Sequence, residues 1–192
     1  MASIVEEFMS SLGPEVSQKL SSKTDIDLNT IQNILPVIAP MILGGLKKQK
    51  DEHGGQDRVD HILNKYGNPS VLNNIDDLFQ QKLNDKTTDP KLGGLLGNAG
   101  TDATNLLSDK FNIDSNTAAK IIPMLAPIVL GFLTKKRDAG TGSSGLAGLL
   151  DKDGDGSVLD DVAGLFLSGL GTGSKSSNLL SGVLGGLFGG KK

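Results

Sequence analysis

The residues best suited to chemistry form an acidic loop in the last quarter of the chain, where the sequence reads D-x-D-x-D-G from Asp151 to Gly156. Calcium binds six to eight oxygen ligands at about 2.3–2.6 Å, and carboxylates at alternate positions of a tight loop can converge on one ion. Gly156 permits the sharp turn that such a loop needs. The spacing therefore predicts one calcium site, whose candidate ligands are the side chains of Asp151, Asp153, Asp155, Asp160 and Asp161 and the backbone carbonyl of Ser157.

This loop resembles the calcium loop of EF-hand and dockerin proteins over about eleven residues. The match runs position by position from Asp151 to Ser157. The twelfth position, where the motif has a bidentate Glu, is Val162, so Asp160 or Asp161 has to complete the coordination. The choice between calcium and magnesium stays open. Because no second loop of this kind accompanies it, a structural role is favoured over calcium sensing.

The elements around the loop come from an internal duplication. A shift of 87 residues superimposes two stretches of the chain without a gap from residue 20 to residue 79, and it places Pro36 and Pro40 on Pro123 and Pro127. The sequence therefore predicts two tandem copies, residues 1–87 and 88–174, followed by a Gly/Ser-rich apolar tail at 175–192.

The first copy supplies an internal control for the metal site. Its equivalent loop, residues 64–74, has Asn at four of the five acidic positions and Tyr66 at the fifth, so five negative charges become none. Asn can still cap and turn the backbone, and this loop is interpreted as a metal-free version of the same connector. Without a cation, the five carboxylates of the second loop would repel one another. A solvated acidic turn is the alternative interpretation of the second loop.

Each copy is expected to consist of helices joined by short loops, which makes the fold class all-α. A helix is expected over residues 14–22, and Asp27 or Asn29 can cap the next one. Residues 30–46 carry a broad apolar helical face, but Pro36 and Pro40 predict a kink or a split near residue 35. Gly44-Gly45 and Gly131 are expected to end the long helices, or else to allow close helix contact. A shorter helix should precede Gly67 and another should follow Ser70.

Composition excludes several classes of site. The 192 residues contain no Cys and two His, which excludes disulfides, thiolate metal sites and cysteine nucleophiles. A Walker loop and a dinucleotide fingerprint both fail around Gly169–Ser176, because the glycine expected before Lys175 is Ser174. His53 and His61 are expected to be surface residues, and Glu6-Glu7 and Asp76-Asp77 solvated helix faces. The chain is therefore expected not to be an enzyme.

The apolar segments bear on partners and location. The runs 34–46 and 121–133 are each 13 residues long, shorter than a spanning helix of about 20, and are interpreted as buried core helices. In the tail, glycines recur every four residues from Gly182 to Gly190, a spacing that lets another helix approach closely. Membrane contact through 177–190 is the alternative for this tail. The acidic start of the chain does not have the pattern of a signal peptide, so a cytoplasmic location is favoured, with non-classical export as the alternative.

The repeated block resembles the YidB-like family of uncharacterised bacterial domains, on the strength of Ile34–Gly44, its partner at 121–131, and Leu149–Ser157. This resemblance implies a small all-α bacterial domain and no established activity. The sequence as a whole favours a calcium-binding structural protein that forms homo-oligomers, including filaments. A DNA-associated regulatory protein is the alternative, against which the net charge of −3 argues.

Overall fold

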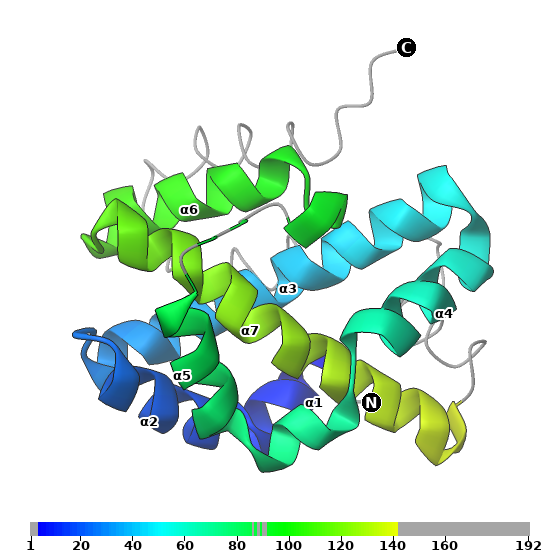
Figure 1. Ribbon diagram of the computed structural model, residues 1–192, viewed down its shortest axis with the longest axis horizontal. Coiled ribbons are helices and arrows are strands. Elements are labelled where there is room, and N and C mark those ends of the chain that lie inside the picture. Colours follow the sequence, from blue (N-terminus) through cyan, green and yellow to red (C-terminus); the bar gives the residue numbers. More distant parts are fainter. Residues whose placement is uncertain (1–3, 86, 88, 90–91, 142–192) are drawn as a thin grey trace.

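The computed structural model describes residues 4–141 except residues 86, 88, 90 and 91. Within this part of the chain every regular element is a helix, which confirms the all-α prediction (Figure 1). The α-helices are α1 (Ile4–Ser11), α2 (Gly13–Lys23), α3 (Leu28–His53), α4 (Gly55–Tyr66), α5 (Ile75–Asn84), α6 (Asn98–Phe111) and α7 (Ser115–Lys136). Three short helical turns complete it: η1 (Pro69–Asn73), η2 (Leu92–Gly94) and η3 (Arg137–Thr141).

The two long helices are equivalent elements of the two copies. Helix α3 begins at Leu28 and α7 at Ser115, which are 87 residues apart. Asp27 caps α3, since its side chain accepts from the Thr30 amide at 2.9 Å, and Asp114 caps α7 through two amide hydrogen bonds. The Thr30 hydroxyl and then its amide hold the pKa of Asp27 below its ordinary value, and Thr117 does the same for Asp114. The duplication therefore extends from sequence to local structure.

Both prolines of each pair lie inside a continuous helix. Pro36 and Pro40 fall within α3, and Pro123 and Pro127 within α7. The expected split near residue 35 is therefore wrong. Pro36 removes the hydrogen bond to the carbonyl of Gln32, but Gln32 is exposed, so that carbonyl can face water. The ten consecutive buried residues from Val37 to Leu46 offset the loss, because burial of apolar surface outweighs intrinsic helix propensity.

The glycines of the long helices do not end them. Gly44 and Gly45 lie inside α3, which ends at His53, and Gly131 lies inside α7. The expected termination is therefore wrong, and the alternative of close contact holds. A Cβ atom on Gly45 would lie 2.5 Å from the Leu96 side chain, and one on Gly131 would lie 3.0 Å from the Asn68 carbonyl oxygen. A methyl group at either position would meet atoms of the other copy.

The shorter elements agree with the sequence in most respects. Helices α2 and α4 lie where they were expected. The helix expected after Ser70 is divided into η1 and α5, because Asn74 breaks the α-helical backbone between them. Helix α1 was predicted only as a solvated acidic face, yet it buries Ile4, Val5 and Phe8.

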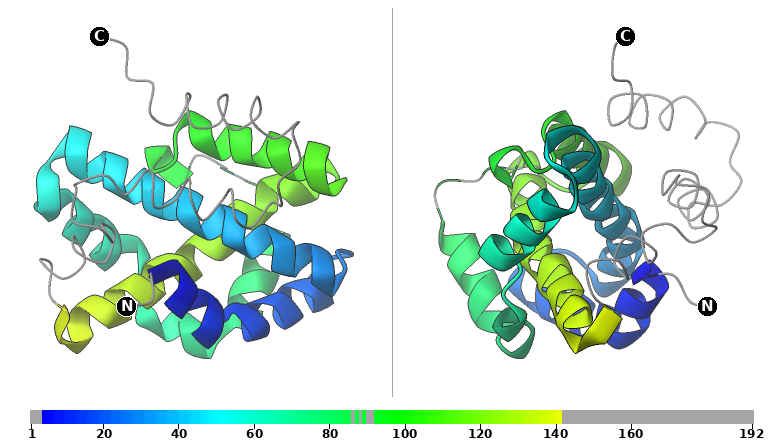
Figure 2. Two further views of the ribbon diagram at one scale, coloured as in Figure 1. Left: turned by 180° about the vertical axis from the view of Figure 1, so that it is seen from behind. Right: turned by 90° about the vertical axis from the view of Figure 1, so that its right-hand side faces the viewer.

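One hydrophobic core joins the described parts of the two copies. Its residues come from α1 to α5 and also from α6 and α7. Helices α3 and α7 cross within it, with α6 on one side of the crossing and α1, α2 and α5 on the other (Figures 1 and 2). Helix α7 contacts α4, η1 and α5 of the first copy as well as α6 of its own. The division at residue 87 stays a prediction from the repeat.

Two helices are long and apolar enough to cross a membrane by length and composition alone. They are Leu28–His53 and Ser115–Gly140. Within the fold, 67% and 72% of their most apolar windows are buried, respectively. Their apolar character is therefore accounted for by the core, as the core helices of many soluble proteins show.

Candidate functional site

The predicted metal ligands lie outside the described residues. These are Asp151, Asp153, Asp155, Ser157, Asp160 and Asp161. Within the described residues, no group of three His, Cys, Asp or Glu side chains is placed to hold a metal ion. The equivalent loop of the first copy, residues 64–74, is described, and it shows how the chain builds this connector.

The first-copy loop is shaped by its own backbone and side chains. Helix α4 ends at Tyr66, and the Gly67 amide donates to the Leu63 carbonyl at 2.8 Å. The Asn68 side chain then accepts from the Ser70 amide at 3.0 Å and starts η1. Asn68 corresponds to Asp155 of the second loop, and a carboxylate can accept the same hydrogen bond. The turn thus needs an oxygen at this position and does not need a charge.

The first-copy loop packs closely on α7 because each side of the contact has a glycine, Gly67 in the loop and Gly131 in α7. A Cβ atom on Gly67 would lie 2.5 Å from Thr134 Oγ1 and 2.7 Å from the Leu130 carbonyl oxygen. On the other side of the contact, a Cβ atom on Gly131 would lie 3.1 Å from Val71 Cγ2. Thr134 is buried, and its hydroxyl donates to the Leu130 carbonyl at 3.0 Å. The connector of the first copy is therefore a contact surface for the long helix of the second.

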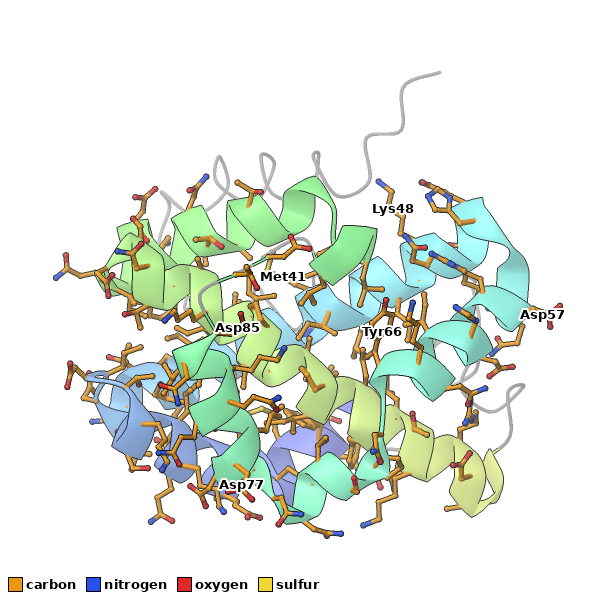
Figure 3. All side chains as sticks on the ribbon, viewed as in Figure 1. Met41, Lys48, Asp57, Tyr66, Asp77 and Asp85 are labelled. Carbon is orange, nitrogen blue, oxygen red and sulfur yellow. The ribbon has the colours of Figure 1, made fainter. Side chains whose placement is uncertain are left out.

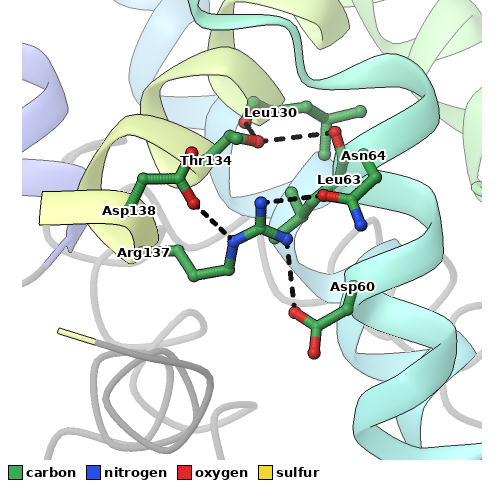
Figure 4. Close-up of polar contacts among 7 residues, drawn as sticks. All are labelled: Asp60, Leu63, Asn64, Leu130, Thr134, Arg137 and Asp138. Carbon is green, nitrogen blue, oxygen red and sulfur yellow. Dashed lines mark hydrogen bonds and ion pairs between the residues drawn. The ribbon is translucent and has the colours of Figure 1, made fainter. Parts of the chain in front are cut away.

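Arg137, which directly follows α7, adds polar contacts between α7 and helix α4 (Figure 4). Arg137 Nη2 donates to Asn64 Oδ1 at 2.8 Å, and Nη1 to Asp60 Oδ1 at 3.4 Å. Its Nε donates to Asp138 Oδ1 at 3.0 Å, and its side chain is only 15% exposed. The sequence analysis did not single out Arg137 and missed this role. The signal that the sequence offers is that the 87-residue shift places Arg137 on Lys50, so both copies carry a cation at this position.

Helix α1 and the turn around η2 make equivalent contacts across the copies. The rings of Phe8 and Phe132 pack edge to face, with centroids 5.5 Å apart. Shifting both positions by 87 residues gives Leu95 and Gly45, and a Cβ atom on Gly45 would lie 2.9 Å from the Leu95 carbonyl oxygen. In the same way, the ion pair of Lys136 with Glu7 corresponds to the hydrogen bond from Gln49 Nε2 to the Gly94 carbonyl, 3.3 Å long. Within the described residues, these two pairs of contacts obey the 87-residue relation in both directions, as a pseudo-twofold relation between the copies requires.

The buried amide of Gln49 ties three segments together. Its Nε2 donates to the Gly94 carbonyl, and its Oε1 accepts from Arg58 Nε at 3.0 Å. This links α3, α4 and the turn that opens the second copy. A buried amide is stable only when its polar atoms are hydrogen-bonded, so the network fixes the position of η2 on α3.

The remaining polar residues singled out from sequence have structural positions. His53 and His61 are exposed on α3 and α4. Asp76 pairs with Lys19 of α2 at 2.5 Å, and this contact lowers the pKa of Asp76. Charged side chains such as Lys48, Asp57 and Asp77 lie at the periphery of the described fold (Figure 3). The structure does not bring these residues together.

A small pocket of about 120 Å³ lies beside the linker between the copies. Lys120 is one of its lining residues and donates to the Leu83 carbonyl at 2.8 Å, which connects α7 to the end of α5. Asp85 accepts from the Thr87 hydroxyl and amide, and these bonds hold its pKa below the ordinary value. The polar groups named here are already hydrogen-bonded, so they fix the linker.

Comparison with protein families gives one match, to a bacterial family of proteins of unknown function, DUF937. Its model matches residues 6–136 and again residues 133–192, which together span most of the sequence. The chain belongs to the DUF937 family. Two successive matches agree with a chain built from tandem copies. No curated protein and no solved structure matches this DUF937 chain.

Proposed function

We propose that this DUF937 protein is a non-enzymatic structural protein that binds one calcium ion and associates with further copies of itself. The observation that carries the proposal is the pseudo-twofold packing of the two copies. Phe8 packs on Phe132, and at the equivalent place a Cβ atom on Gly45 would lie 2.9 Å from the Leu95 carbonyl oxygen. Surfaces that are complementary between two copies in one chain are complementary between copies in two chains.

Self-association then follows by exchange of these contacts between chains. If the linker around residue 87 opens, the second copy of one chain can cover the first copy of another. A closed exchange gives a dimer, and an exchange that does not close gives a filament. The described fold offers few other apolar contacts, because the large exposed hydrophobic side chains within it are those of Leu28 and Tyr66.

The calcium part of the proposal depends on the spacing of the acidic loop. Asp151, Asp153 and Asp155 supply carboxylates at alternate positions, and the Ser157 carbonyl supplies a further oxygen. Asp160 or Asp161 completes the set. Calcium there would stiffen the second copy by joining groups that repel one another without it.

Light scattering after size exclusion, over a range of protein concentrations in calcium and in chelator, tests both parts. We expect the mean mass to rise with concentration in calcium and to fall in chelator. Asp153→Asn should weaken calcium binding in calorimetry, whereas Asp57→Asn, at an exposed position of α4, should not. A monomer under all conditions would overturn self-association, and the absence of calcium binding at millimolar ion would overturn the metal site.

A further inference from the structure

The second copy begins with a turn, residues 92–96, that is fixed on α3 of the first copy. Leu96 of this turn is buried, and a Cβ atom on Gly45 would lie 2.5 Å from its side chain. The buried amide of Gln49 donates to the Gly94 carbonyl at 3.3 Å. Packing and a hydrogen bond therefore both hold this turn on the first copy.

A single glycine joins the turn 92–96 to α6. Gly97 has a φ of 54° and a ψ of −131°, a backbone conformation that glycine adopts readily and residues with a Cβ rarely do. Gly97 is the N-cap of α6 and provides no side-chain hydrogen bond, whereas Asp27 and Asp114 cap α3 and α7. Apart from its chain neighbours, no atom of the described residues lies within 4 Å of the place of a Cβ on Gly97. The junction is therefore defined by the backbone of one residue and not by packing around it.

We infer that Gly97 is the hinge at which the chain opens for exchange, so that α6 and α7 of one chain cover the first copy of a second chain. In the exchanged chain residue 97 is extended, and the turn 92–96 stays on α3 of its own chain. The inference rests on the self-association proposed above, and it places the opening beyond the repeat boundary at residue 87.

The backbone conformation at the hinge sets the balance between the closed chain and the exchanged dimer. Helix α7 makes the same contacts with α4, η1 and α5 whether they form within one chain or between two. These contacts cancel in the comparison, and what remains is the free energy of association and the backbone energy at residue 97. A residue with a Cβ raises the energy of the closed chain, and it does not raise that of the extended hinge.

Alanine substitutions at three glycines test this hinge. Gly97→Ala strains the hinge itself, and Gly55→Ala and Gly94→Ala are matched controls. Gly55 and Gly94 have positive φ values of 67° and 96°, and within the described part of the chain a Cβ on either would meet nothing within 4 Å. Gly55 begins α4 inside the first copy, and Gly94 lies in the turn that stays on α3. The strain of both controls is therefore the same in the closed and in the exchanged chain.

Each variant is unfolded and refolded in calcium at several protein concentrations, and its mass is measured by light scattering after size exclusion. We expect all three variants to melt at a lower temperature than the natural chain. Only Gly97→Ala should raise the dimer association constant, by about tenfold or more, since both hinges of a dimer are relieved. Gly97→Asn should raise it less, because asparagine tolerates positive φ better than alanine, and it serves as the test if Gly97→Ala does not refold.

A cysteine pair shows whether the dimer is an exchanged one, because the natural chain contains no Cys. Val71→Cys with Gly131→Cys places one cysteine on η1 and the other on α7. The Val71 Cγ2 atom lies 3.1 Å from the place of a Cβ on Gly131, which is within reach of a disulfide. After oxidation, a non-reducing gel should show that dimers of Gly97→Ala are linked between chains and that monomers are linked within one chain.

The hinge is refuted if Gly97→Ala leaves the association constant unchanged, or if either control raises it as much as Gly97→Ala does. Dimers whose cysteines close only within one chain refute exchange. A natural chain that stays monomeric while Gly97→Ala forms linked dimers supports the hinge and overturns self-association of the natural protein. Monomers of every variant overturn both proposals.

Discussion

Replacement of Gly67 by alanine tests the close approach between the first-copy loop and α7. The new Cβ atom would lie 2.5 Å from Thr134 Oγ1, 2.7 Å from the Leu130 carbonyl oxygen and 2.8 Å from the Leu63 carbonyl oxygen. Two of these three atoms are backbone oxygens of helices, so they cannot rotate away. Moving the loop back from α7 by somewhat less than about 1 Å would restore the contacts with Thr134 and Leu130. The contact with the Leu63 oxygen, which belongs to α4, requires an additional local change at the end of that helix.

The magnitude follows from overpacking, which costs about 1–3 kcal/mol in a well-packed core. Gly67 is the C-cap of α4 and has a φ of −100°, so an alanine there is not strained by its backbone and gains no helix propensity to offset the clash. We therefore expect Gly67→Ala to lower the free energy of unfolding by about 2–3 kcal/mol. In a chain of this length that corresponds to a decrease in melting temperature of roughly 4–12 °C.

Two other glycines serve as matched controls in urea unfolding monitored by circular dichroism. Gly131→Ala meets the Asn68 oxygen at 3.0 Å and gains about 1 kcal/mol of helix propensity, so its net cost should be smaller. Gly13→Ala meets its first neighbour, Met9 Cε, only at 3.4 Å and should be neutral or stabilising. If Gly67→Ala is as stable as Gly131→Ala or Gly13→Ala, the close approach of loop and helix is wrong.

Three further variants test the contacts between the copies and the helix caps. Phe8→Ala should cost about 3–5 kcal/mol, because it empties a buried aromatic site, whereas Phe8→Leu, which loses the edge-to-face pair but keeps much of the apolar volume, should cost less; a neutral Phe8→Ala in thermal unfolding would refute the burial of Phe8 against Phe132. Arg137→Ala should cost about 1–2 kcal/mol in urea unfolding, and Arg137→Lys should recover only part of it, because one ammonium group does not reproduce the three-sided contact; full recovery would contradict this reasoning. The caps Asp27 and Asp114 have pKa values below the ordinary value of 3.8, so their stabilising contribution is present above about pH 4 and is lost as the pH falls through their folded-state pKa values. A double variant with Asn at both caps should therefore lose less stability between pH 6 and pH 2 than the natural chain does, and an identical loss would refute the assignment.

Local features of the fold were predictable because they depend on local chemistry. The cap at Asp27, one of the two candidates, and the positions of α2 and α4 follow from residue type and periodicity. The prolines and glycines of the long helices were misjudged, because their local cost is offset by tertiary contacts that a sequence window does not contain. Pro36 is tolerated in a helix buried over ten consecutive residues, and Gly45 is required by the approach of Leu96.

The contact site itself could not be predicted, for a different reason. A repeat shows that two units are alike, and it does not show where they touch. The role of Arg137 depends on Asp60 and Asn64, which lie more than 70 positions earlier in the chain. The sequence around Arg137 places it directly after the cations Lys135 and Lys136 of the last turn of α7, and it does not show which residues of the first copy Arg137 contacts.

In the described fold, elements of each copy pack on the long helix of the other copy, and this arrangement bears on how such a chain can arise. A unit of one copy alone would leave its long helix without the loop and helices that cover α7, so it would be stable only as a homodimer, with two identical connectors. Gene duplication and fusion replace that dimer by one chain, in which the second unit is present at millimolar effective concentration. Once the units are joined, the two connectors no longer have to be identical, and their sequences differ accordingly: residues 64–74 carry asparagines where residues 151–161 carry aspartates.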